Sequence, residues 1–286
     1  MFNELQHQQR IARAKARFIP DADFLMTVVV EDMMERLSAV NRTFENGIAL
    51  FGRTPLLADA MGDCSQIRNV LRVDEVQHLG TADHIATPTL LGLKKESADL
   101  IIAPLSLHWS NDLPGTLIQL RQTLRPDGLL LAVLPGPDTL HELRTALLSA
   151  ESECTDGAAM RVDAFTDIRD AGALLQRTQY ALPVVDQDLT IVRYDRAMDL
   201  IRDLRGFGVT SHPAEDTYPP LTRTILRRME EIYVDRFSDA DGRIRASFSF
   251  ISMAGWGPHE SQQKPLKPGS ATTRLADALK VKEVKL

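Results

Sequence analysis

Residues that could do chemistry follow two of the apolar runs. His108 and Trp109 come directly after the run "ADLIIAPLSL", and Asp138 comes shortly after "LLLAVLP". A histidine there could act as a general base, because its unperturbed pKa is near 6.5. A carboxylate there could meet a cationic substrate such as an arginine side chain. Both places have structural alternatives, since His108 and Trp109 could pack under the next helix and Asp138 could cap one.

Two later segments carry residues suited to recognition. Arg202 and Arg205 end a predicted helix and could contact an acidic substrate or partner, or simply stabilise the C-terminal end of the helix dipole. The polar loop "GWGPHESQQKPLKPGSA" carries Trp256 and Glu260 and could recognise a ligand. A plain surface connection is the alternative for this loop.

Patterns for metal chemistry are weak. His141 and Glu142 begin a string similar to HE-x-x-H, but Thr145 stands in place of the second histidine, so a zinc-peptidase site is excluded. Cys64 and Cys154 form no CxxC pair, which argues against a thiolate metal site or a disulfide framework. We therefore expect no metal site, and a reducing cytoplasm fits the cysteine usage.

Alternating strands and helices must position these side chains. Short apolar runs predict strands, and residues at helical spacing predict the helices between them. This order is typical of a doubly wound, mostly parallel sheet, in which ligands bind beyond the carboxyl ends of the strands. The functional loops are therefore those after Leu50, Val73, Ala103 and Leu134. The predicted strands of this half are 47–50, 69–74, 98–107 and 129–135, and the predicted helices start at 55, 111 and 139.

The second half continues the pattern with a helical insertion. A helix over 165–180 precedes a strand or hairpin over 182–194, and the last strand covers 245–257. Two amphipathic helices between these strands predict a lid. The expected division is 1–42 as N-terminal helices, 43–194 as the core, 195–237 as the helical lid, and 238–286 as the last strand and C-terminal loop completing the core.

Composition and charge limit the classes of function. The chain has 286 residues and a net charge of -6, so it can bury a large core and is not built to bind nucleic acid. Its longest apolar runs are far shorter than the roughly 20 residues of a spanning helix. The basic N-terminal segment "LQHQQRIARAKARF" has three open interpretations: a solvated helix face, a surface for anionic lipid or a partner, and a transit peptide.

Several segments of the sequence resemble those of one known superfamily. The stretch from "SADLIIAPLSLHWSNDLP" to "LRPDGLLLAVLPGPDTLHELR" resembles the fourth and fifth strand region of class I S-adenosylmethionine-dependent methyltransferases. Together with "RDLRGFG" and "GWGPHESQQKPLKPGSA", it looks like the branch of methyltransferase-like respiratory complex I assembly factors and their bacterial relatives. The resemblance implies an α/β fold with a doubly wound, mostly parallel seven-stranded sheet, Rossmann-like, and a helical lid insertion.

The resemblance also implies a function. It suggests S-adenosyl-L-methionine as cofactor and a modification of a protein side chain in respiratory complex I assembly, where the mitochondrial members are linked to arginine hydroxylation. A malonyl-carrier-protein methyltransferase of biotin synthesis, or a non-catalytic assembly factor that kept the fold, are the alternatives. The start "MFN" before the basic helix is similar to that of the family's mature domain. It favours a bacterial cytoplasmic protein without a transit peptide, with peripheral contact at the inner membrane and a complex I subunit as partner.

The first loop departs from the family's pattern. Family members have a strand ending in an acid and then a glycine-rich turn. With Gly52 and Arg53 aligned to the middle glycine and its arginine, the acid falls at Ile48 and the outer glycines fall at Leu50 and Thr54. A Cβ at Leu50 or Thr54 predicts crowding of the cofactor or a strained turn, costing on the order of 1 kcal/mol or more per residue.

Other cofactor contacts are implied by the same resemblance. Asp74, at the end of the second strand, would hold the ribose hydroxyls, and Thr87 or Thr89 lies where the family often has an acid near the adenine. Gly52, Leu105 and Trp109 complete the predicted cofactor site.

Overall fold

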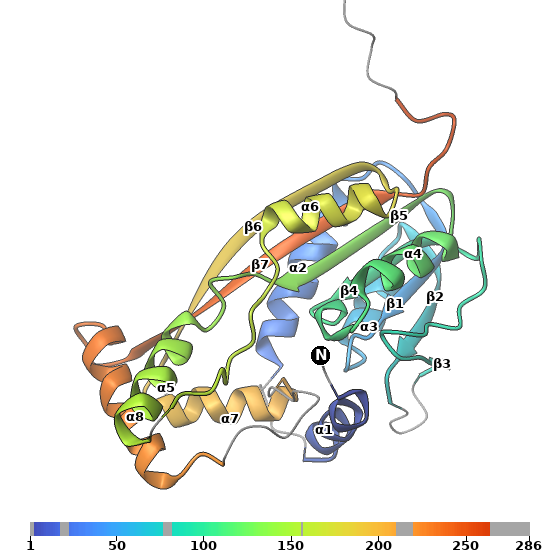
Figure 1. The fold of residues 1–286 in the computed structure, drawn as a ribbon. Coiled ribbons are helices and arrows are strands. Elements are labelled where there is room, and N and C mark those ends of the chain that lie inside the picture. The colour runs from blue at the N-terminus through green and yellow to red at the C-terminus, as the bar shows by residue number, and fades with distance from the viewer. Residues whose placement is uncertain (1–2, 18–22, 77–81, 156, 210–219, 264–286) are drawn as a thin grey trace, which may run out of the picture.

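The computed structural model describes residues 3–17, 23–76, 82–155, 157–209 and 220–263. These residues contain one seven-stranded sheet with the strand order β3-β2-β1-β4-β5-β7-β6 (Figure 1). All neighbouring strands are parallel except β7, which is antiparallel to both β5 and β6. The predicted fold class is confirmed. The strands are β1 Phe44–Leu50, β2 Ile67–Asp74, β3 His84–Ile85, β4 Ala98–Pro104, β5 Leu124–Pro135, β6 Ala181–Tyr194 and β7 Ile244–Trp256.

Helices cover both faces of the sheet. One buried cluster joins the sheet to α2, α3, α5, α7 and α8, and a second joins its other face to α4 and α6. In Figure 1, α4 and α6 lie in front of the sheet and α2 lies behind it. The helices are α1 Glu4–Arg17, α2 Phe24–Ser38, α3 Leu56–Asp63, α4 Leu113–Thr123, α5 His141–Cys154, α6 Ile168–Arg177, α7 Ala197–Phe207 and α8 Arg223–Phe237.

The predicted elements agree with the structure apart from short pieces. The two-residue strand β3 was not predicted, since His84–Ile85 is too short to show a period. The predicted turn at 125–128 interrupts the pairing of β4 with β5, whose register jumps there, and Asp127 has a φ of 62°. The predicted lid segment contains α7 and α8. The proposed division of the chain into four segments stays a prediction.

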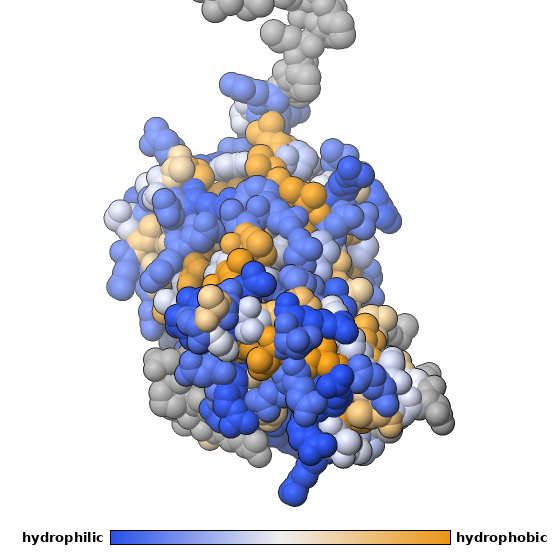
Figure 2. All heavy atoms as spheres, turned by 90° about the vertical axis from the view of Figure 1, so that its left-hand side faces the viewer, coloured by the Kyte–Doolittle hydropathy of each residue, from blue (hydrophilic) through white to orange (hydrophobic). Residues whose placement is uncertain are grey.

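Hydrophilic side chains cover most of the face shown in Figure 2, with smaller apolar patches between them. Among the residues that the structure describes, no helix combines the length and the apolar character needed to cross a bilayer.

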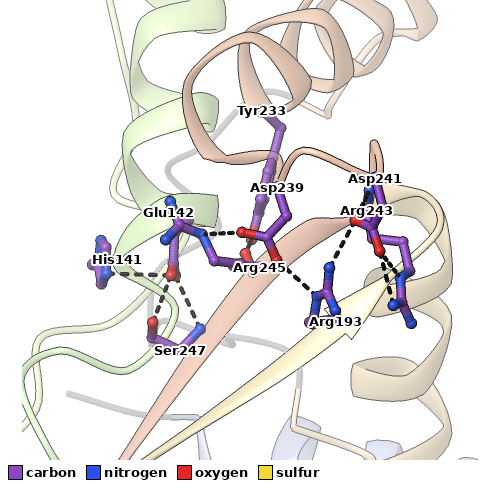
Figure 3. Close-up of polar contacts among 9 residues, drawn as sticks. All are labelled: His141, Glu142, Arg193, Tyr233, Asp239, Asp241, Arg243, Arg245 and Ser247. Atoms are coloured by element: carbon purple, nitrogen blue, oxygen red, sulfur yellow. Dashed lines mark hydrogen bonds and ion pairs between the residues drawn. The ribbon is translucent and has the colours of Figure 1, made fainter.

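A polar cluster ties α8 and the antiparallel strands β6 and β7 to α5 (Figure 3). The buried carboxylate of Glu142, in the first turn of α5, accepts hydrogen bonds from the backbone N–H of Ser247 at 3.1 Å and from its hydroxyl at 2.5 Å. The hydroxyl of Tyr233 on α8 donates to the carbonyl of Arg245 at 2.9 Å. Burial raises the pKa of the Tyr233 phenol, so it stays a neutral donor.

Gly208 allows α7 to end close against α1. It is left-handed, with φ at 78°, and a Cβ there would lie 3.2 Å from the Cβ of Ala14. We expect Gly208→Ala to destabilise the protein by about 1–2 kcal/mol, because the residue combines an unfavourable φ with a tight contact. Urea unfolding measures this, and hydrogen exchange of α1 should accelerate.

Gly62 gives the matched control for this prediction. It lies in α3, and a Cβ there would meet nothing within 4 Å. Gly62→Ala should therefore be neutral or stabilising, by up to about 1 kcal/mol. Equal effects of the two substitutions would contradict the close approach of α1 and α7.

Candidate functional site

The carboxyl ends of β1, β4 and β5 meet at one edge of the sheet, and the backbone there is strained. Phe51, Arg53, Leu105 and Leu140 follow these strands and have φ between 43° and 60°. A left-handed conformation costs a non-glycine residue roughly 1–2 kcal/mol, and such strain is frequent at functional sites. The other left-handed non-glycine residues among those that the structure describes lie away from this edge: Glu96, Asp127, Gln179 and Leu182. The edge predicted to bind a ligand is thus also a strained one.

The turn after β1 differs in detail from the expectation. Leu50 ends β1 and is fully buried in the core, so its side chain does not crowd the turn. The strain expected at Leu50 and Thr54 falls instead on Phe51 and Arg53. Close packing explains a glycine at position 52, because a Cβ there would lie 3.1 Å from the Cβ of Leu57 in α3. Its predicted contact with a cofactor stays a prediction.

Arg53 brings buried hydrogen-bond donors to this edge. The residue is 5% exposed, and its Nη1 donates to the carbonyl of Phe207 at 2.9 Å. Its Nε and Nη2, like the hydroxyl of Ser106 after β4, have no hydrogen-bond partner among the described residues. Burial lowers the pKa of the Arg53 guanidinium, and the carboxylates of Glu75 and Asp74 oppose this shift. Since a buried unsatisfied donor costs about 1–3 kcal/mol, these groups are suited to a ligand with acceptor oxygens.

The acids at the end of β2, Asp74 and the next residue Glu75, are buried and already have partners. Asp74 accepts from the guanidinium of Arg72 at 2.6 Å, and the carboxylate of Glu75 lies 3.0 Å from the Nε2 of His7 on α1. The His7 ring also packs on Trp109, with ring centroids 4.9 Å apart. Sequence reasoning did not find the pair of His7 and Glu75, because nothing in the spacing of residues so far apart signals a contact.

The basic N-terminal helix is therefore not solvated all round. His7 and Ile11 are buried, and α1 packs against α7. In Figure 1 the two helices lie near each other below the sheet. Its basic face contributes Arg10 and Arg13 to the cavity described next.

A cavity of about 600 Å³ lies beyond β4 and β5. It is bounded by α1, α5, α7 and the start of β7. The structure brings four of the predicted residues together in its lining: Leu105, His108, Trp109 and Arg205. His108 stands between two aromatic rings, with centroids 4.7 Å from Trp109 and 6.2 Å from Phe165. A ring held in this way could exchange a proton with a ligand in the cavity.

Asp138 and Arg202 lie outside this lining. Asp138 is exposed, and its carboxylate lies 3.5 Å from the amide nitrogen of Gln187. The expectation that Asp138 caps the next helix is wrong, because α5 begins at His141 with Leu140 at the N-cap position and no side-chain cap. Arg202 forms an exposed ion pair with Asp199 at 2.8 Å.

The predicted recognition residues of the C-terminal loop lie at the opposite edge of the sheet, whereas Thr89 lies beside α1. Trp256 ends β7 beside Leu129, and the guanidinium of Arg42 lies 5.6 Å from its ring centroid. Glu260 is exposed in the loop that follows, and residues 264–271 of that loop lie outside the described residues. Thr89 donates a hydrogen bond to the carboxylate of Glu4 on α1. Recognition roles for these residues stay predictions.

No metal centre stands out in the part of the chain that the structure describes. There, no three His, Cys, Asp or Glu side chains gather in a way that could hold an ion.

Comparison with known proteins places the chain among named relatives. It is 38% identical to the arginine-hydroxylase NDUFAF5, mitochondrial, of Danio rerio over 197 residues, which are 69% of this chain and 61% of that protein. It is 29% identical to the protein of the same name from Mus musculus, over 98% of this chain and 84% of that one. A malonyl-[acyl-carrier protein] O-methyltransferase of Laribacter hongkongensis is 33% identical, over 63% of this chain and 58% of the relative. No protein-family model matches the chain.

Solved structures share the fold at low identity. A candidate methyltransferase from Bacillus halodurans superposes with a TM-score of 0.53 at 12% identity, over 80% of this chain and 99% of that one. The YcgJ protein of Bacillus subtilis gives a TM-score of 0.54 at 13% identity, over 82% and 99%. The chain spans 61% and 43% of the two NDUFAF5 proteins from Danio rerio and Dictyostelium discoideum. The sequence is thus similar to that of the arginine-hydroxylase NDUFAF5 proteins, and the chain has the fold of class I S-adenosylmethionine-dependent methyltransferases.

Proposed function

We propose that this chain is an S-adenosyl-L-methionine-dependent enzyme of the methyltransferase type that modifies a protein-borne group during respiratory complex I assembly. The observation that carries the proposal is the strained edge of the sheet, where the buried donors of Arg53 and Ser106 lack partners among the described residues. A cavity containing His108 lies beyond the neighbouring strands β4 and β5. The named relatives support the same assignment.

The residues at this edge fit the polar ends of the cofactor. The unpartnered Nε and Nη2 of Arg53, with the Ser106 hydroxyl, would hold the carboxylate of its methionine portion. Glu75, or Asp74, would hold the ribose hydroxyls. When bound, the cofactor supplies an electrophilic methyl group.

In the present arrangement α1 and α7 cover these groups. His7 reaches Glu75, and the carbonyl of Phe207 at the end of α7 accepts from Arg53. We infer that both helices move aside for the cofactor to enter and pack back over it, which excludes water from the reacting groups.

His108 is the residue we propose as general base. It lines the cavity, and its ring is held by Trp109 and Phe165, so it could remove a proton from the acceptor. His108→Gln should lower the rate of modification by about 100-fold or more, while binding of S-adenosylhomocysteine stays within about threefold. An equally large loss of S-adenosylhomocysteine binding would show that His108 contributes to binding the cofactor and does not act as a base.

Transfer of label tests the proposed function. Protein extracts and membranes from cells lacking this chain are incubated with the purified protein and methyl-labelled cofactor. We expect label in a complex I subunit or a carrier protein, dependent on His108. Mass spectrometry of the same proteins separates a labelled methyl group from an added oxygen, which would carry no label. Absence of cofactor binding, together with rescued complex I assembly by the His108→Gln variant, would leave a non-catalytic assembly factor.

The cellular setting belongs to the same proposal. A complex I subunit as partner, a bacterial cytoplasm and contact with the inner membrane surface follow from the resemblance, and fractionation of tagged protein tests them.

A further inference from the structure

The strand β6 ends the sheet and is paired on one side. Within the part of the chain that the structure describes, β7 is its only strand neighbour (Figure 1). The pairing of β6 with β7 is regular from Val184 to Tyr194. Such an edge strand presents a row of backbone N–H and C=O groups that can pair with a further strand.

Natural edge strands usually carry features that prevent such pairing, and β6 has them only at its start. Pro183 and a shift of register lie there, between Ala181 and Val184. The regular part that follows contains neither proline nor lysine. It presents Leu189 and Ile191, whose side chains are 56% and 51% exposed. Because these residues are two positions apart, both side chains lie on the same face of the strand.

The charged side chains in the regular part of β6 have ion-pair partners within the chain. Asp186 and Asp188 both pair with Arg36 of α2, at 2.7 Å and 2.9 Å. Arg193 pairs with two aspartates of the segment between α8 and β7, each at 2.7 Å (Figure 3). Charges on an edge strand keep other strands away. Since the charges of β6 are balanced by opposite charges of the same chain, this repulsion is weakened.

We propose that β6 pairs antiparallel with β6 of a second copy of this chain, around a two-fold axis at Thr190. In this register Leu189 lies opposite Ile191 of the other copy, and the symmetry forms the same pair twice. Four half-exposed apolar side chains then meet at the axis, and cross-strand pairs of this kind stabilise a sheet. The two sheets become one continuous sheet.

The charge pattern of β6 fits this register. Asp188 faces Val192 of the other copy, and Arg193 faces Gln187, so no like charges lie opposite each other. An axis at Asp188 would instead place this carboxylate opposite its own copy, which is destabilising. The pairing leaves the carboxyl ends of β1, β4 and β5 untouched, so it does not depend on the proposed function.

Sedimentation velocity of the full chain tests the proposal. We expect a dimer at about 100 μM protein. Leu189→Glu should weaken the association about tenfold or more, because the symmetry places a carboxylate opposite Ile191 twice. Leu90→Glu is the matched control, since Leu90 is 70% exposed and follows β3 at the other end of the strand order. Both side chains are exposed, so both variants should fold, which a melting curve checks.

Cross-linking tests the register. Thr190→Cys, made with Cys64→Ser and Cys154→Ser, should form a disulfide between two copies on mild oxidation, because the two Cβ atoms at the axis lie about 4.5–5.5 Å apart. Gln187→Cys in the same background should not, since its two copies are separated by roughly 20 Å along the strands.

Three results would overturn the proposal: a monomer at about 100 μM, equal effects of the two glutamate substitutions, or equal cross-linking at the two cysteine positions. A monomer in which the amides of β6 exchange slowly would show that another part of this chain covers the edge, and it would overturn the proposal as well.

Discussion

Arg53→Met is expected to weaken binding of S-adenosylhomocysteine about 10- to 100-fold with little change in stability. A charge-assisted hydrogen bond is worth about 1.5–3 kcal/mol, and Arg53 offers two buried donors without a partner among the described residues. The variant loses the bond to Phe207, about 1 kcal/mol, but it also removes the buried unsatisfied donors. Titration calorimetry measures the affinity, and urea unfolding measures the stability.

The control for this prediction is Arg42→Met at the opposite edge of the sheet. Arg42 pairs with Asp127 at 2.6 Å and should not affect the ligand. Unchanged affinity in Arg53→Met would contradict the assignment of Arg53, and a large loss of stability would make Arg53 a structural residue.

Glu142→Ala is expected to lower the free energy of unfolding by about 2–4 kcal/mol. The carboxylate is 3% exposed and accepts from two groups of Ser247, so its loss leaves a buried N–H and a hydroxyl unsatisfied (Figure 3). This contact joins α5 to β7, both of which line the cavity. Urea unfolding monitored by circular dichroism gives the value.

Glu153→Ala, near the end of the same helix, is the matched control. Its carboxylate is exposed and paired with Arg228, and surface ion pairs contribute little. We expect a change below about 1 kcal/mol. Similar values for the two variants would mean that the Ser247 contacts do not stabilise the fold.

The fold was predictable because its signals are local. Continuous apolar runs such as 129–135 identify buried strands, and Asp112 and Gly208 mark the start of α4 and the end of α7 as the structure has them. The alternation of these elements was sufficient to predict the doubly wound sheet and its functional edge.

The site was predictable in part. His108, Trp109 and Leu105 follow a strand whose carboxyl end is the expected place for ligands, and the structure puts them in the cavity lining. The contacts of His7 with Glu75 and of Arg53 with Phe207 join residues that are 68 and 154 positions apart. No period or spacing in the sequence encodes such contacts.

The most direct test of the account is a crystal structure with S-adenosylhomocysteine. The account predicts the ligand at the carboxyl ends of β1, β2 and β4, with its carboxylate on the Nε and Nη2 of Arg53, and with the His7 contact to Glu75 broken or rearranged. A ligand bound elsewhere, or crystals that exclude it while α1 keeps its place, would contradict a cofactor site at this edge.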